Sequence, residues 1–73
     1  SIGANIKEAK YAQSNKDFIS KLSIARKEAS ESEYWIELLR NEYLTDEECN
    51  SLLKDLIEIL KMLTTSIKKA STK

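Results

Sequence analysis

The feature that most constrains the fold is a long apolar stripe at helical spacing in the middle of the chain. Its members alternate spacings of four and three residues without a break: Phe18, Leu22, Ala25, Ala29, Ser32, Ile36, Leu39 and Tyr43. Because an α-helix turns once every 3.6 residues, this alternation keeps one side of a helix facing a neighbour. The stripe therefore predicts a long helix that packs lengthwise against another helix.

Two more helices are predicted on either side of this one. Ile2, Ile6 and Ala9 share one face of a short helix over residues 1–12. The central helix is expected over 15–43 and a third over 46–70. The stripe of the third helix comprises Cys49, Leu53, Leu56, Leu60, Leu63, Ile67 and Ala70. Both connections are short, so successive helices should run antiparallel.

The predicted helix starts carry capping signals. Ser14 precedes Asp17 by three residues, and Thr45 precedes Glu48 by three, which is the spacing of a capping box. The chain has no proline and only one glycine in 73 residues, and this composition favours long helices. We therefore predict one all-α domain over 1–73, an antiparallel bundle that contributes three helices of a four-helix bundle.

The central helix also carries a second apolar face. Ile24, Trp35 and Leu38 lie roughly 100° around the helix axis from the main stripe, and Glu31 falls among them. A single neighbouring helix cannot cover both faces, so Ile24, Glu31, Trp35 and Leu38 form a predicted oligomer interface. Glu31 is then either a polar group at that interface or a carboxylate at a solvated edge. The Tyr34 and Trp35 rings are expected to pack beside Leu38 and Leu39 rather than stack on bases.

The chain is small for a core that stands alone. A domain of this size supplies roughly 3–5 kcal/mol of stability from one core, and the single cysteine, Cys49, cannot form an internal disulfide. Further stability is expected from self-association or from an upstream segment. The second source is suggested by a start at Ser1 that already belongs to a helical pattern and lacks an initiator methionine.

Charge is balanced overall and uneven along the chain. Residues 1–27 hold six bases and two acids, 28–48 hold one base and eight acids, and 49–73 hold five bases and two acids. Antiparallel packing would gather a basic pole of Lys7, Lys10, Lys16, Lys21, Lys68 and Lys69. Such a pole either contacts RNA or DNA, because lysines displace phosphate counterions, or is a solvated end of the bundle. The neutral total favours the second interpretation.

Residue pairs that suggest chemistry are few. Asp55 with Glu58, and Glu28 with Glu31, each share a helix side and could hold a divalent cation, but the chain has no histidine to complete a bundle metal site. Cys49 lies on the inner stripe without a histidine to activate it, so we expect a core residue. We predict no enzyme activity, catalytic residue, cofactor, metal or small-molecule substrate. A carboxylate metalloenzyme, a third class beside a scaffold and a nucleic-acid-binding protein, would require bound metal.

No window approaches the ~18 consecutive apolar residues of a membrane span, and no signal-like start is present. We therefore expect a soluble cytoplasmic protein that does not contact a membrane.

Two motifs and the end of the third helix resemble one bacterial family. Residues 1–9 read SIGANIKEA, residues 17–25 read DFISKLSIA and continue to Glu31 and Trp35, and residues 60–63 read LKML. They are similar to the S-I-x-x-N-I-x-E-[GA], F-x-x-x-L-x-I-A and K-M-L elements of the 23S rRNA-intervening-sequence proteins. Asn5, Glu8 and Glu31 match the polar signature positions, and no catalytic role comes with them.

The resemblance implies a four-helix bundle whose first helix, and the start of whose second, precede Ser1. It also implies a likeness to pentameric barrels of such bundles, including a retroelement accessory protein that partners a reverse transcriptase and contacts nucleic acid through a basic surface. Ala9 stands where the family often has glycine, and the neutral charge departs from that basic surface. We predict a non-enzymatic scaffold or interaction subunit, pentameric by resemblance; the alternative is a nucleic-acid-binding accessory protein.

Overall fold

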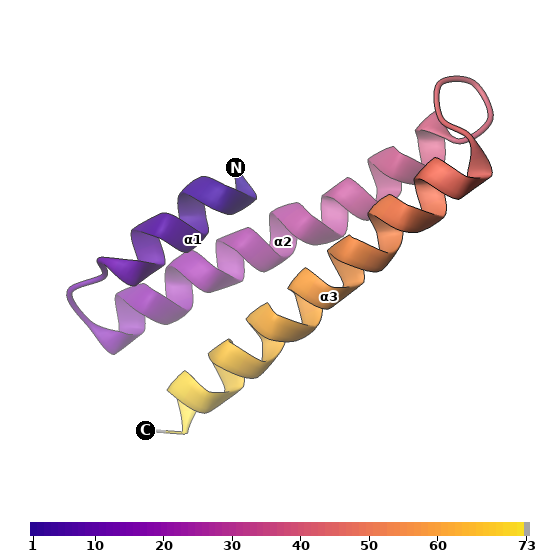
Figure 1. Cartoon of the computed structure of the whole chain (residues 1–73). Coiled ribbons are helices and arrows are strands. Elements are labelled where there is room, and N and C mark those ends of the chain that lie inside the picture. Colours follow the sequence, from indigo (N-terminus) through magenta and orange to yellow (C-terminus); the bar gives the residue numbers. More distant parts are fainter. Residues whose placement is uncertain (73) are drawn as a thin grey trace.

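The computed structural model describes residues 1–72, and this part of the chain is built from three helices. They are α1 (Ile2–Lys10), α2 (Asn15–Leu39) and α3 (Asp46–Ser71). α1 and α3 each pack along α2 and run opposite to it, and the rod they form measures 44 × 19 × 14 Å (Figure 1). The all-α prediction is confirmed.

α1 is shorter than the predicted segment 1–12. Its start is capped by the Ser1 hydroxyl, which accepts a hydrogen bond from the Ala4 N–H at 3.1 Å, and it ends at Lys10. The chain then has to turn back so that Ser14 can adopt the extended conformation of an N-cap, with φ −145° and ψ 160°. Residues 11–14 therefore leave the helix to start α2.

α2 ends at Leu39, four residues before the predicted end at 43. Arg40 is extended and Asn41 has a φ of 75°, a left-handed conformation that asparagine tolerates better than most residues. The N–H groups of Tyr43 and Leu44 both bond to the Leu39 carbonyl at 3.1 Å and close a tight turn. Tyr43 continues the spacing of the stripe, yet it lies in this turn rather than on the helix.

The side chain of Arg40 holds the turn against both helices. Its guanidinium bonds to Glu37 at the end of α2 and to Asp46 at the start of α3, with a distance of 2.8 Å from Nη1 to Asp46 Oδ1. The hydrogen bonds with Glu37 and then Asp46 raise the pKa of Arg40 above its usual value. These hydrogen bonds hold the turn that ends α2 at Leu39, although the spacing of the apolar stripe continues to Tyr43.

α3 begins with a complete capping box. The Thr45 hydroxyl accepts from the Glu48 N–H at 3.1 Å, and the Glu48 carboxylate accepts from the Thr45 N–H at 2.9 Å. The bond from the Thr45 backbone N–H, and after it an interaction of the Thr45 hydroxyl with the same carboxylate, lower the pKa of Glu48. At the start of α2, the Ser14 hydroxyl accepts from the Asp17 N–H at 3.0 Å.

The core lies where the helices meet α2. Ala25 and Ala29 are fully buried, which lets the neighbouring helices approach closely. The remaining buried side chains come from all three helices: Ala9, Leu22, Cys49, Leu56, Leu63 and Ala70. Every residue of the predicted third-helix stripe is buried or half-buried. None of the helices in residues 1–72 is both long and apolar enough to cross a membrane.

Candidate functional site

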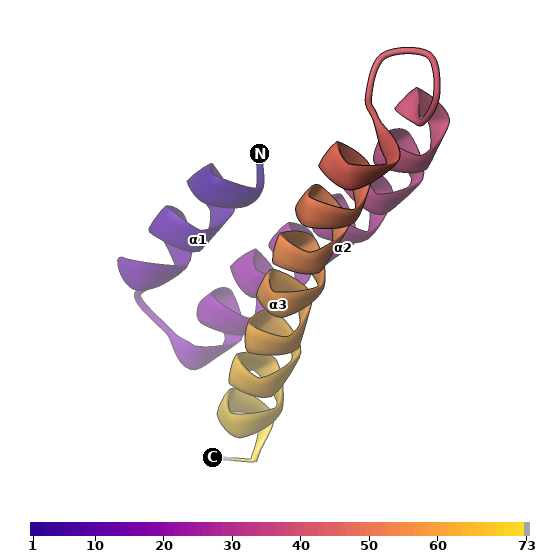
Figure 2. The same cartoon turned by 45° about the vertical axis from the view of Figure 1, so that its right-hand side comes forward.

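α1 covers only the first part of α2. Asn5, near the start of α1, donates from Nδ2 to the Glu28 carboxylate at 2.6 Å, so α1 begins beside the middle of α2. Beyond that point the hairpin of α2 and α3 projects past α1 (Figures 1 and 2). Within residues 1–72, the distal half of α2 therefore packs against α3 alone.

The predicted interface residues lie exposed on α2. Trp35 is 59% exposed and Leu38 53%, and Ile24 and Glu31 are also exposed. Tyr34 and Trp35 contact each other edge to face, with 5.5 Å between ring centroids. Within residues 1–72 the two rings are exposed rather than in the core, and Tyr34 also lines a hollow against α3. The packing of Trp35 at an oligomer interface stays a prediction.

Glu28 is the polar group at the junction of α1 with α2. Its carboxylate is half-buried between α1 and α2 and accepts from Asn5, whereas Glu31 is exposed. Sequence reasoning missed this pair because the partners are 23 positions apart and neither lies in an apolar stripe. Asn5 is a signature position of the resemblance, and its long-range bond gives that position a structural reason.

An apolar groove separates α1 from α3 above α2. It has a volume of about 380 Å³ and is lined mainly by Ile6, Phe18, Leu22, Ile59, Met62 and Leu63. Met62 is 68% exposed, and Leu63 forms the floor with the buried residues Ala9, Leu22 and Ala25. A groove of this shape between two parallel-running helices matches the position of one more helix in a bundle.

In the structure, the lysines of the predicted basic pole lie at one end of the rod. The Asn15 amide donates to the Ala70 carbonyl at 2.7 Å, which joins the start of α2 to the end of α3. Lys7 and Lys10 lie in the last turn of α1, and Lys68 and Lys69 in the last turn of α3. Lys16 and Lys21 lie near the start of α2, where Lys21 is paired with Glu8 at 3.4 Å.

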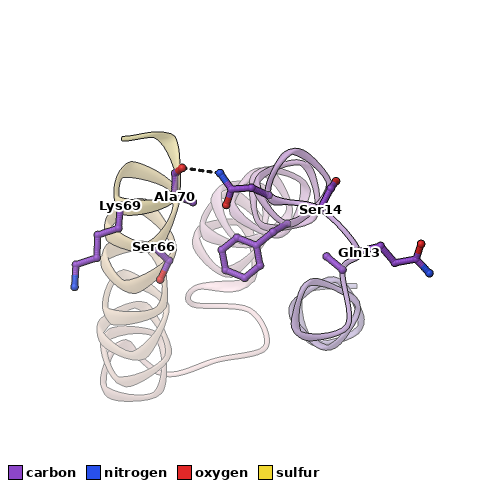
Figure 3. A pocket seen from close by; sticks show the side chains of 8 residues that line it. Gln13, Ser14, Ser66, Lys69 and Ala70 are labelled. Atoms are coloured by element: carbon purple, nitrogen blue, oxygen red, sulfur yellow. Dashed lines mark hydrogen bonds between the residues drawn. The ribbon is translucent and has the colours of Figure 1, made fainter. Parts of the chain in front are cut away.

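A shallow hollow at this pole is not lined by converging cations. Its walls include Gln13, Ser14, Asn15, Ser66 and Lys69. Lys69 and Gln13 point away from the hollow on opposite sides (Figure 3). Lys10 lies over the Tyr11 ring, 5.5 Å from its centroid. The pole therefore presents dispersed lysines on an outer surface rather than a pocket built around one anion.

The other predicted chemical groups lie apart from one another. Cys49 is fully buried, and its thiol donates to the Ile36 carbonyl at 3.7 Å. Asp55 and Glu58 are exposed on α3. Within residues 1–72, His, Cys, Asp and Glu side chains form no group of three that could hold a metal ion.

The fold and its surfaces define a class: an all-α antiparallel helical protein with an uncovered aromatic face on its central helix, α2, and two oppositely charged ends. The model of one family matches residues 1–65, that of the 23S rRNA-intervening sequence proteins. This chain belongs to the 23S rRNA-intervening sequence protein family.

A solved structure supports the same assignment. It is the crystal structure of a protein of unknown function from the S23 ribosomal protein family of Bacteroides thetaiotaomicron VPI-5482, with 59% sequence identity and a TM-score of 0.88. The match covers 92% of this chain and 63% of that one, so this chain spans less than two thirds of the solved protein. The comparison with curated proteins gave no significant match.

Proposed function

We propose that this protein is a non-enzymatic helical-bundle subunit that self-associates into a cyclic homo-oligomer and acts as a scaffold or interaction protein. The observation that carries the proposal is the uncovered face of α2, where Trp35 and Leu38 are each more than half exposed. Burying apolar surface contributes about 25 cal/mol per Å², and contiguous exposed apolar surface marks interaction sites. A second copy of the chain would bury this face.

The four-helix form is part of the proposal. The groove between α1 and α3 leaves Ile6 and Met62 exposed above a buried floor. The similar solved structure contains chain beyond the matched 63%. A fourth helix in the groove would cover these side chains and complete the bundle that the resemblance implies. The subunit number of five rests on the resemblance alone.

The test of self-association is the mass in solution. Trp35→Glu places a charge in the centre of the uncovered face, and we expect light scattering after size exclusion to report smaller particles than for the unmodified chain. Tyr43→Glu is the matched control, since Tyr43 is an exposed aromatic residue in the turn after α2. If Trp35→Glu leaves the mass unchanged, this face is not the interface.

The second candidate function is a nucleic-acid-binding accessory protein. It is favoured by the gathering of lysines from α1, α2 and α3 at one end of the rod. Contacts of lysines with phosphates would make the affinity fall steeply with salt. Gel-shift titrations with RNA and DNA should then show weaker binding when Lys7, Lys10 and Lys16 are changed together to Gln. If the affinity changes neither with the salt concentration nor with the lysine substitutions, this second candidate function is refuted.

A further inference from the structure

A second groove lies between α2 and α3, beyond the point where α1 begins. We call it the distal groove; it has a volume of about 390 Å³ and is lined by Ser30, Glu33, Tyr34, Glu37, Leu53 and Ile57. At 100° per residue, its α2 wall points roughly 180° from Lys21 and Glu28, which bind residues of α1. The same wall points roughly 120° from Trp35 and Leu38. The distal groove therefore lies on a different side of α2 from α1 and from the side chains that the proposed self-association would bury.

The walls of the distal groove combine apolar surface with acidic groups. Tyr34 on α2 is 61% exposed and Ile57 on α3 is 45% exposed. The two acids of the α2 wall differ in their pairing. Glu37 is paired with Arg40 at 3.1 Å, whereas Glu33 is half-buried and forms no ion pair within residues 1–72. The groove thus has one carboxylate that no cation of the described chain neutralises.

This carboxylate limits what can cover the groove. A partner that covered Leu53 and Ile57 would also remove Glu33 from water, and burying a charge without a counter-charge is costly. A partner that brings its own cation offsets this cost. Residues 28–48 hold eight acids and one base, so a basic partner is also attracted before contact. Charge complementarity therefore favours a basic partner over a neutral or an acidic one.

The shape of the groove favours a helix as the partner. A groove between two antiparallel helices can accept the apolar side of a third, with apolar residues spaced three and four apart. The α2 wall from Ser30 to Glu37 covers two turns, about 10 Å at about 1.5 Å per residue. The apolar groove between α1 and α3 has Lys10 on its rim, which repels a basic helix. Charge thus distinguishes the two grooves.

We propose that the distal groove binds a basic amphipathic helix of another protein, whose apolar side chains pack on Leu53 and Ile57 while a lysine or arginine pairs with Glu33. This inference deepens the proposed interaction role, on which it rests, by naming the chemistry of the partner. It does not require self-association, because Trp35 and Leu38 lie on a different side of α2.

The test uses a fluorescein-labelled synthetic peptide of about 18 residues, with leucines spaced three and four apart and lysines beside them. Fluorescence anisotropy measures its affinity for the chain at about 0.15 M salt. A second peptide has the same composition in an order that gives no apolar face. We expect the first peptide to bind, and the second to bind at least about tenfold more weakly.

Variants of the chain locate the bound peptide. Glu33→Gln and Ile57→Ser should each weaken binding about tenfold, because the first removes the partner of a lysine and the second removes apolar contact. The matched controls are Glu58→Gln, which removes the charge of an exposed acid of α3, and Met62→Ser, which removes apolar surface from the groove between α1 and α3. Both controls should bind as the unmodified chain does. Circular dichroism at 222 nm checks that each variant is folded.

The outcomes separate this proposal from self-association. Equal loss in Glu33→Gln and Glu58→Gln means attraction by overall charge, and loss in Met62→Ser places the peptide in the other groove; either result overturns the proposal. An absence of binding, or equal binding of the two peptides, also overturns it. If Glu33→Gln lowers the mass of the chain without peptide, a second copy covers the groove, so self-association stands and the basic partner is refuted. A monomeric chain that binds the peptide through Glu33 refutes self-association alone.

Discussion

Replacing Leu63 with alanine tests whether the three helices share one core. Leu63 on α3 is 4% exposed and packs against Ala9 of α1 and against Leu22 and Ala25 of α2. The change removes three carbon atoms, about 2.4 kcal/mol at about 0.8 kcal/mol per buried carbon. An added cavity term would raise this figure, but Leu63 forms the floor of an open groove. The loss should therefore fall near the low end of the usual range, about 2–3 kcal/mol.

The assay is urea unfolding followed by circular dichroism at 222 nm, at one fixed protein concentration. Since a domain of this size is stabilised by roughly 3–5 kcal/mol, Leu63→Ala should lower the midpoint by about half or more with an unchanged slope. The control is Met62→Ala, one position earlier and 68% exposed, which should cost less than about 0.5 kcal/mol. Equal costs for the two variants would refute the shared core.

Three further predictions concern the turn and the helix junctions. Asn41→Val should destabilise the chain by about 1–2 kcal/mol because a β-branched residue is strained at a φ of 75°, whereas Asn41→Gly should not; thermal unfolding of both variants decides this. Glu48 has a lowered pKa, so the folded state binds fewer protons there. The stability it contributes is present above its usual pKa of 4.5 and is lost as the pH falls through the lower folded value. The melting temperatures of the unmodified chain and Glu48→Gln should therefore converge as the pH is lowered below 4.5, and a constant gap from pH 7 to pH 3 would contradict this. Glu28→Ala removes the acceptor of Asn5, so amide exchange should accelerate in α1 and stay unchanged in α3; equal acceleration in both helices would argue against a local role.

The sequence predicted helices best where capping residues mark their ends. Thr45 and Glu48 form the capping box expected from their spacing, and the residues from Cys49 to Ala70 face the core as their periodicity requires. These features depend on neighbours three or four positions apart. Periodicity failed at the end of α2, where Tyr43 keeps the spacing of the stripe but the Arg40 and Asn41 backbone leaves the helix.

Contacts across the molecule were harder to predict than helix positions. Neither the bond of Asn5 to Glu28 nor that of Asn15 to Ala70 follows from an apolar pattern. Asp17 and Lys21 have the spacing of a favourable pair along one helix, yet Lys21 pairs with Glu8 on α1. A side chain at a helix junction can pair with a residue of its own helix or of the neighbouring helix. The packing of the helices determines which pair forms.

The position of the uncovered face of α2 could be predicted from the sequence, but its exposure could not. Spacing alone placed Ile24, Glu31, Trp35 and Leu38 on one side of a helix but left open whether a neighbouring helix covered them. Within residues 1–72 the bond of Asn5 to Glu28 marks how α1 is aligned on α2, and the aromatic pair of Tyr34 and Trp35 is exposed. The same junction thus aligns α1 beside the exposed face of α2, so a change at Glu28 should alter both helix docking and self-association.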